Sequence, residues 1–436
     1  MSSKYLLLGF CLVVLLSAPL AGVGGWRIVG ILGEQTQGWV AWTDFVNLYT
    51  GASLLARTPG QVYSPAAQQA FEQALTDPGH PYLGFFLPPP SAVLVTWLGW
   101  LPYSAAYAAW LGLGLACVAG AAWLLGQTLR GRLAWLAGLL LFLPVLEGLG
   151  QGQTSALLLL GMAGLARGLS SPSAVASGGS RAARQPEAVQ TRSWLWLALL
   201  ACLLKPQLGL VPLLALLLDR RFGTLLRAAA ALAGLSLVGL LLAGPELLSS
   251  YRALSSDKLV DSLTAPPDFL PGPTLLHAMQ RFFGTGMLAD ALGLCLAALV
   301  LVGVGWAWRG GVLPDDRRLL QVAVLPLASV LVAPYALIHE VSCWPVAFCL
   351  LERYTRQRPL ARALLLVTAI GVWFTAELAV LEPNATRGAD LAALLGLLLV
   401  VAIIRDLALT RRPTAAALRV PTIPAWPPVA LGRRTR

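Results

Sequence analysis

Charged side chains are scarce in this chain of 436 residues, in which Asp, Glu, Lys and Arg make up 12% and hydrophobic residues 57%. A water-soluble domain of this size needs more charge on its surface. Apolar runs long enough to span a bilayer recur from one end of the sequence to the other. The sequence therefore excludes a soluble enzyme, a disordered scaffold and a disulfide-stapled secreted domain, and it predicts an all-α polytopic membrane protein.

Motifs for metals, redox chemistry and nucleotides are missing as well. The six cysteines form no Cys-x-x-Cys pair and the three histidines are not clustered, so we expect no metal site and no cofactor. There is no P-loop, no dinucleotide fingerprint in a βαβ context and no Asp-x-Asp pair, so an activated donor should arrive within the membrane. The net charge of +11 is not gathered on one face, and membrane topology explains it better than nucleic acid does.

The apolar segments predict about 12 membrane crossings. They are read at 5–33, 102–127, 133–149, 153–168, 193–218, 223–243, 288–308, 319–334, 338–352, 360–381 and 388–408. Residues 86–101 begin Phe-Leu-Pro-Pro-Pro and are predicted to be re-entrant, and 193–218 is predicted to form two short helices that meet at Lys205-Pro206. The first segment could also be a cleaved signal peptide.

Basic residues predict the orientation, because loops that stay in the cytoplasm collect Lys and Arg. One side can be assigned 24 of the 31 Lys and Arg residues, and we take that side as cytoplasmic. The loops 34–88 and 244–287 then lie outside and carry loop helices, and the Ser/Gly/Arg-rich linker 169–192 lies inside. We expect one multispanning domain over 1–408 in the plasma membrane, with its active site facing outward, and a disordered basic tail over 409–436.

Polar side chains near the outer face mark the candidate site, since ionisable groups are costly in a membrane and are therefore a functional hypothesis by default. They include Asp44, Gln151, Gln153, Lys205, Asp261, Arg281, His339 and Glu340.

Four of these side chains also have a structural explanation. Asp44 could act as a general base or bind a cation, or it could simply cap a helix that starts at Phe45. Gln151 and Gln153 could recognise hydroxyl groups or belong to a plain polar turn. Lys205, at a helix break, could bind an anion such as phosphate or extend to the lipid headgroups.

The order of these features resembles the polyprenol-phosphate-mannose-dependent mannosyltransferases of family 87, which are multispanning C-type glycosyltransferases. The matching elements are Asp44 with Tyr49, the run from Leu54 to Tyr63, Phe86-Leu87-Pro88-Pro89, Gly150-Gln151-Gly152-Gln153, Lys205-Pro206, and Pro334-Tyr335 with His339. The resemblance implies a C-type bundle that takes a sugar from a polyprenyl-phosphate-linked donor and passes it to a hydroxyl of a glycolipid or glycan. It implies that Asp44 is the catalytic carboxylate. The chain departs from the family in Val260-Asp261-Ser262-Leu263 and in Glu340 after His339, which bears on the acceptor and the sugar.

With this family in view, the candidate residues divide into three roles. Asp44 is the expected catalytic base, and Lys205, Arg281 and His339 are the expected contacts of the donor phosphate. The sugar or acceptor is expected to contact Tyr49, Tyr63, Gln151, Gln153, Asp261 and Glu340. The alternative is a transporter or flippase of a lipid-linked or anionic substrate, for which we would expect charges at mid-membrane on several helices.

Overall fold

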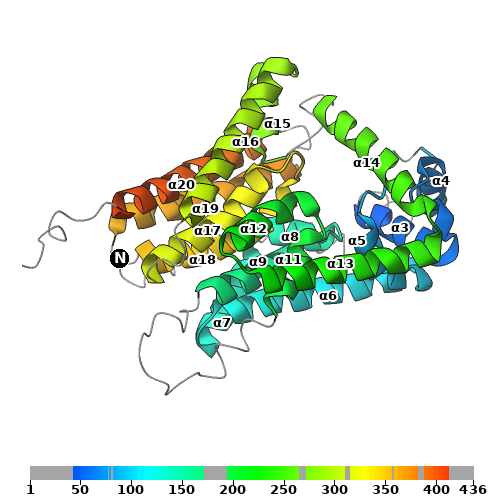
Figure 1. Cartoon of the computed structure of the whole chain (residues 1–436), viewed down its shortest axis with the longest axis horizontal. Helices are drawn as coiled ribbons and strands as arrows, with labels where there is room; N and C mark the ends of the chain where they lie inside the picture. The colour runs from blue at the N-terminus through cyan, green and yellow to red at the C-terminus, as the bar shows by residue number, and fades with distance from the viewer. Residues whose placement is uncertain are drawn as a thin grey trace, which may run out of the picture.

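The structure is a computed structural model that describes residues 43–76, 78–79, 82–170, 194–264, 272–309, 315–355, 358–381 and 387–411. The expected first span, nearly all of the linker 169–192 and the tail after residue 411 lie outside the described residues. Every regular element in the described residues is a helix, as the sequence predicted (Figure 1).

A cap lies at one end of the molecule, at the right of Figure 1. It consists of α3 (Phe45–Arg57), η1 (Pro59–Gln61), α4 (Pro65–Leu75), α5 (Pro89–Val95), η2 (Thr96–Trp100) and α14 (Glu246–Thr264). Its own hydrophobic core includes Phe45, Tyr63, Phe85 and Leu98, all almost fully buried. The cap comes from the two loops that the sequence placed outside, 34–88 and 244–287, together with the short helices of 86–101.

The remaining helices form a bundle in two groups that follow one another in the sequence. The first group is α6 (Tyr103–Leu125), α7 (Leu129–Leu141), α8 (Leu143–Gly150), α9 (Ser155–Ser170), α11 (Leu195–Leu203), α12 (Pro206–Leu218) and α13 (Phe222–Ala243). The second group is α15 (Leu275–Phe283), α16 (Met287–Trp308), α17 (Asp315–Leu331), η4 (Ile338–Cys343), α18 (Trp344–Thr355), α19 (Pro359–Leu381) and α20 (Arg387–Arg411). The groups meet where α17 packs on α9 and α12. One continuous hydrophobic core runs through both.

Four of the described helices, α6, α13, α16 and α20, are long and apolar enough to cross a membrane, and a fifth span is formed if α7 and α8 are counted together. The α7–α8 pair is bent by 67°. The sequence predicts one segment over 133–149, and the bend arises because Pro144 cannot continue α7 as a regular helix. Other apolar helices are shorter, such as α9 with 16 residues. The count of about 12 crossings stays a prediction.

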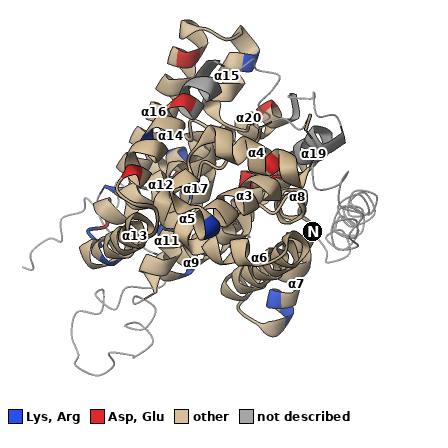
Figure 2. Cartoon of the chain, turned by 90° about the vertical axis from the view of Figure 1, so that its right-hand side faces the viewer, with Lys and Arg blue, Asp and Glu red and all other residues tan. Residues whose placement is uncertain are grey.

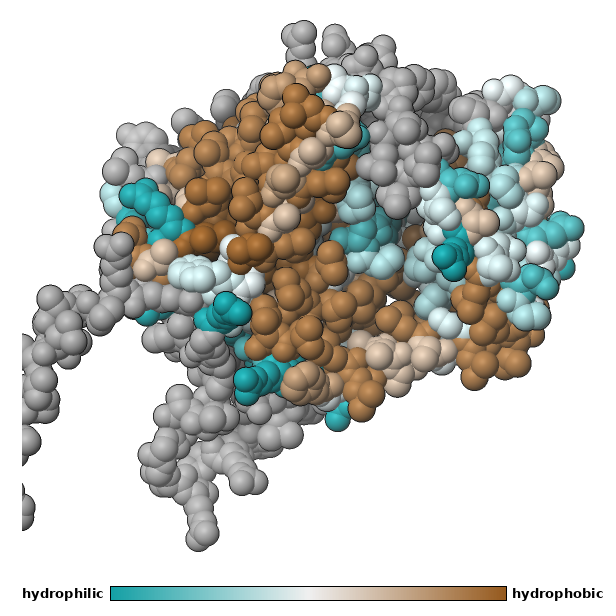
Figure 3. Space-filling view, turned by 45° about the horizontal axis from the view of Figure 1, so that its top comes forward, coloured by the Kyte–Doolittle hydropathy of each residue, from teal (hydrophilic) through white to brown (hydrophobic). Residues whose placement is uncertain are grey.

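The surface of the bundle differs from that of the cap (Figure 3). Large hydrophobic side chains are exposed along α13 and α16, including Leu226, Leu241, Leu299 and Val302. Hydrophilic residues cover much of the cap, and charged residues are sparse along the bundle helices when they are viewed from the cap (Figure 2). An apolar outer surface on helices of this length is what a lipid environment requires.

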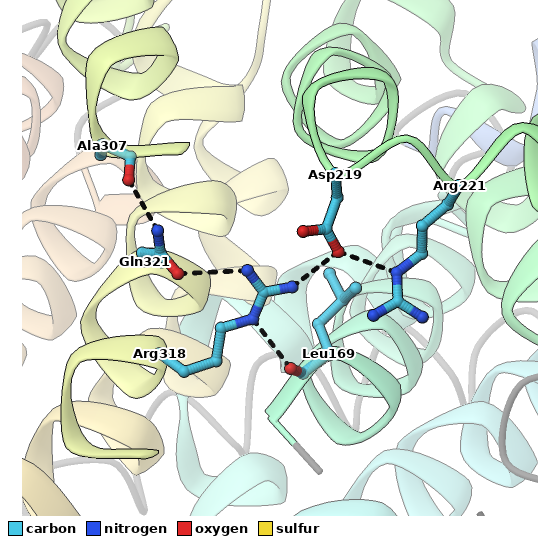
Figure 4. Close-up of polar contacts among 6 residues, drawn as sticks. All are labelled: Leu169, Asp219, Arg221, Ala307, Arg318 and Gln321. Atoms are coloured by element: carbon cyan, nitrogen blue, oxygen red, sulfur yellow. Dashed lines mark hydrogen bonds and ion pairs between the residues drawn. The ribbon is translucent and has the colours of Figure 1, made fainter. Parts of the chain in front are cut away.

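At the end of the bundle away from the cap, a buried polar network joins the two groups (Figure 4). Arg318 of α17 is 3% exposed and donates to Asp219 Oδ2 at 2.8 Å and to the carbonyl oxygen of Leu169 at 3.0 Å. Asp219 also accepts from Arg221 at 2.8 Å. One guanidinium therefore connects α17, the end of α9 and the turn between α12 and α13.

Candidate functional site

The candidate site lies where four interruptions between helices meet, at the end of the bundle beneath the cap. They are the start of α3, the turn between α8 and α9, the break between α11 and α12, and the η4 segment. At each interruption the chain leaves the helix, so its side chains can point toward the other three interruptions. The polar residues that the sequence singled out at these four places contact one another.

Asp44 occupies the N-cap position of α3, but its side chain makes no capping hydrogen bond. Its Oδ2 instead accepts a hydrogen bond of 2.6 Å from Gln153 Nε2, and its backbone N–H donates to Gln151 Oε1 at 3.1 Å. The capping explanation of Asp44 therefore does not account for its carboxylate. The side chain is half-buried and directed to the turn between α8 and α9.

That turn ends α8 in a Schellman motif. The N–H of Gln153 donates to the carbonyl of Gly148 at 2.8 Å, and the N–H of Gly152 donates to that of Leu149 at 3.1 Å. Gly152 has a φ of 67°, and an added Cβ would lie 2.6 Å from the Cβ of Phe45. Glycine is required there for both reasons. The turn thus fixes the two flanking glutamines against the start of α3.

Lys205 lies at the break that the sequence predicted, between α11 and α12. Pro206 is the first residue of α12, where its missing N–H costs nothing, and Lys205 is the extended N-cap residue. Lys205 Nζ donates to Gln153 Oε1 at 3.0 Å and forms an ion pair with Glu340. The amide of Gln153 therefore bridges the Asp44 carboxylate and the Lys205 ammonium.

Glu340 and His339 belong to η4, in which all six residues are buried. Glu340 is 2% exposed, and its Oε1 faces both Lys205 and His339 Nε2, the latter at 3.4 Å. Its second oxygen, Oε2, is buried without a hydrogen-bond partner in the described part of the chain. A buried carboxylate oxygen without a donor is costly, so this oxygen is available to a hydroxyl group of a ligand.

We call this set of residues the polar cluster: Asp44, Gln151, Gln153, Lys205, His339 and Glu340. It holds one ammonium, two carboxylates, one imidazole and two amides within a continuous chain of contacts. Such a set can accept a proton at a carboxylate and offer a cation to an anionic group.

Four other expected site residues are not joined to the polar cluster by these contacts. The hydroxyl groups of Tyr49 and Tyr63 donate to the backbone carbonyls of Leu101 and Leu87, each at 2.7 Å. These bonds give both tyrosines a structural role inside the cap. Asp261 is in α14, and its side chain lies outside the described residues.

Arg281 is the fourth of these residues, and it holds α15 in place. Its Nε pairs with Asp390 at 2.6 Å and its Nη2 donates to the carbonyl of Gly272 at 2.9 Å. Gly272 in turn packs closely on Ala336, because an added Cβ would lie 2.3 Å from the Ala336 carbonyl oxygen. Arg281 therefore supports the segment before η4 indirectly, through the contact of Gly272 with Ala336.

Three residues near the polar cluster were not among the expected ones. Glu147 accepts from Gln151 Nε2 at 2.8 Å, and an acidic residue inside the apolar segment 133–149 could have drawn attention to it. Burial and then the charges of Asp44 and Glu340 raise the pKa of Tyr335, so its ring belongs beside them. His277 of α15 packs edge-on against Tyr335, with ring centroids 6.1 Å apart. Nothing in the sequence around His277 distinguishes it.

The described residues contain no group of three or more His, Cys, Asp or Glu side chains that could hold a metal ion. The polar cluster pairs each carboxylate with a nitrogen donor instead.

Comparison with known families places this site in context. The family model described as Glycosyltransferase family 87 matches residues 85–334, which is more than half of the chain. The chain belongs to glycosyltransferase family 87. It is therefore a membrane glycosyltransferase, with a sugar donor and an acceptor as its ligands. No curated protein and no solved structure matches the chain.

The matched range includes Gln151, Gln153 and Lys205 of the polar cluster. Asp44 lies before it, and His339 and Glu340 follow it within six residues. The contacts described above join these outlying residues to the matched part of this family 87 protein.

Proposed function

We propose that this family 87 protein transfers a hexose, with mannose the expected sugar, from a polyprenyl-phosphate-linked donor to a hydroxyl of a glycolipid or glycan. The observation that supports the proposal is the chain of contacts from Asp44 through Gln153 to Lys205. It sets a carboxylate and a cation on the two sides of one amide. A transfer from a sugar phosphate to an alcohol needs a proton acceptor for the alcohol and a countercharge for the phosphate.

In the proposed reaction Asp44 is the general base of a single displacement. The acceptor oxygen bonds to the anomeric carbon, its proton passes to the Asp44 carboxylate, and the bond from the anomeric carbon to the phosphate oxygen breaks with its electron pair on phosphate. Attack from the opposite side inverts the anomeric centre, so a β-linked donor gives an α-linked product. Asp44 is half-buried, and Gln153 is its one side-chain donor in the described part of the chain, which leaves the second carboxylate oxygen for the proton.

Lys205 is the proposed countercharge for the phosphate. It stands at the N-terminus of α12, where the aligned peptide dipoles add positive potential. Glu340 is the acidic partner of Lys205 in the structure, so the phosphate would replace Glu340 at this ammonium. Glu340, released from Lys205, would then accept hydrogen bonds from sugar hydroxyls, and His339 would contact the phosphate.

The position of the polar cluster supports the proposed donor class. It is beneath a cap on an apolar bundle, so a donor whose activated end is carried on a lipid reaches it from the bilayer. We propose the plasma membrane as the location, a C-type bundle of about 12 crossings as the complete architecture, and the cap side as the outer face.

The test is transfer by purified protein in the presence of a total membrane lipid extract as acceptor, with products identified by mass spectrometry. We expect transfer from polyprenyl-phosphate-linked mannose and none from a nucleotide-linked mannose. Asp44→Asn should lower turnover by about 10²-fold or more, the usual loss on removing an acid–base group. Asp290→Asn, which alters a carboxylate bonded to Gln280 in the second group, is the matched control.

Near-normal turnover of Asp44→Asn would remove Asp44 from the reaction and direct attention to Glu340. Transfer from the nucleotide-linked sugar alone would overturn the proposed donor while leaving the family assignment in place.

A further inference from the structure

A second polar region lies at the end of the bundle away from the polar cluster, and the proposed function does not use it. Three elements reach from one region to the other. From Tyr107, beside the turn between α8 and α9, to Trp123 is about 24 Å along α6. Likewise α9 starts beside that turn and ends near Arg167, and η4 continues into α18, which carries Arg353.

Two adjoining cavities open there. One has a volume of about 330 Å³ and is lined by Trp123, Leu124, Gly126, Gln127, Arg132 and Arg167. The other, of about 290 Å³, shares Leu124, Gln127 and Arg167 with the first and adds Arg353 with further apolar side chains such as Leu319 and Leu350. Because they share three lining residues, they form one groove between α6, α7, α9, α17 and α18. We call it the arginine groove.

The charged side chains among the described lining residues of the arginine groove are all arginines. Arg132, Arg167 and Arg353 line it, and no Asp or Glu is among its described lining residues. Backbone carbonyls at the end of α6 hold two of these guanidinium groups in place. Arg353 Nη2 donates to Leu125 at 2.7 Å, and Arg132 Nε to Gly126 at 3.4 Å. A guanidinium has five N–H donors, so one carbonyl contact leaves others for an anion.

One lining residue, Trp123, supports placing the arginine groove at the headgroup level of a bilayer. Trp123 is 58% exposed near the end of the spanning helix α6, and exposed tryptophan at such a position is typical of the membrane–water interface. The guanidinium of Arg132 lies over its ring, 3.4 Å from the ring centroid. The apolar lining residues, such as Leu319 and Leu350, suit the start of an acyl chain, and the arginines suit a phosphate.

We propose that the arginine groove binds the headgroup phosphate of an anionic phospholipid, with Arg132 and Arg167 as the main contacts. Basic grooves between membrane helices on the cytoplasmic side bind anionic lipid headgroups for the same physical reason, the pairing of guanidinium with phosphate beside apolar walls. The bound lipid would bridge α6 and α9 of the first group to α17 and α18 of the second. It would therefore stabilise the packing between the two groups.

The experiment uses the full chain, purified in a non-ionic detergent and depleted of lipid. Thermal unfolding is followed during titration with phosphatidylglycerol, phosphatidylcholine or inorganic phosphate, and native mass spectrometry counts the phosphatidylglycerol molecules retained. We expect phosphatidylglycerol alone to raise the melting temperature. In Arg167→Gln and Arg132→Gln, the phosphatidylglycerol concentration that gives half of the rise in melting temperature should increase by at least tenfold. Arg130→Gln, an exposed arginine two residues from Arg132 that does not line the groove, should behave as wild type.

Four results would overturn the proposal. They are equal protection by phosphatidylcholine, equal protection by inorganic phosphate, an equal loss in Arg130→Gln, and no loss in either groove variant. None of these readouts measures sugar transfer, so they are independent of whether the proposed reaction is correct.

Discussion

Gln153 Nε2 donates a hydrogen bond of 2.6 Å to Asp44 Oδ2 across 109 residues of sequence. The other end of the same amide accepts from Lys205. The amide therefore fixes the position of the proposed base relative to the proposed phosphate contact, without carrying charge itself.

We expect Gln153→Met, which keeps the length of the side chain and removes both hydrogen bonds, to lower turnover by about tenfold, the factor that corresponds to losing roughly 1.4 kcal/mol of positioning. In a double-mutant cycle with Asp44→Asn the two losses should not add, because both act through one contact. Gln69→Met on the exposed face of α4 is the control. Fully additive losses would show that Gln153 acts independently of Asp44.

The predicted orientation can be tested with single cysteines in a background without the native thiols. Gln69→Cys in α4 and Ser256→Cys in α14 are exposed in the cap and should react with an impermeant thiol reagent added to intact cells. Arg130→Cys, exposed at the other end of the bundle, should react only after permeabilisation. Gln68 would be a poor probe because its side chain is fully buried. The opposite labelling pattern would place the cap in the cytoplasm.

Arg281 can now be tested as either a phosphate contact or a structural residue. Its ion pair with Asp390 is mostly buried, with side chains 4% and 13% exposed, so removal of one partner should cost about 3–5 kcal/mol. We expect Arg281→Gln and Asp390→Asn to lower the melting temperature to a similar extent, with little change in the KM for donor. A large rise in that KM with an unchanged melting temperature would instead restore Arg281 to the donor site.

The lowered pKa of His277 predicts how the free energy of unfolding depends on pH. It lies in α15, outside the spanning helices, and burial, followed by the charge of Arg281, lowers its pKa from 6.5 to about 4. The unfolded chain takes up a proton on this side chain between those two values and the folded chain does not. Stability from this group is therefore complete above pH 6.5 and is lost as the pH falls toward 4.

The measurement is the melting temperature between pH 7.5 and 4.5 for wild type and for His277→Gln, which cannot titrate. The loss on acidification should be smaller in the variant. Parallel curves would mean that His277 does not titrate differently on folding.

The sequence predicted where helices are interrupted better than it predicted which partners individual side chains contact. Lys205-Pro206 and the Pro-rich start of residues 86–101 act through local backbone chemistry, and the structure has short helices at both places. Pro144 carries the same kind of signal, but the apolar residues around it favoured one continuous segment. The bend there became visible only in the structure.

Side-chain partners depend on packing between segments that are distant in the sequence. The pair of Arg281 and Asp390 spans 109 residues, and the carbonyls that receive Tyr49 and Tyr63 lie in later parts of the chain. No local pattern reveals that these polar groups are satisfied within the fold. Asp44, Lys205 and Glu340 were easier to single out because polar groups next to apolar segments are rare.

The ion pairs at the two ends of the bundle bear on how the molecule can move. Lys205 with Glu340 joins the two helix groups beneath the cap, and Arg318 with Asp219 joins them at the far end. A protein that works by alternating access swings two such halves against each other, opening first one side and then the other. Here each swing would have to separate a buried ion pair. In the proposed reaction the donor phosphate takes the place of Glu340 at Lys205, so the pair of Arg318 with Asp219 is the contact that would keep the two helix groups joined at the far end while substrate binds beneath the cap.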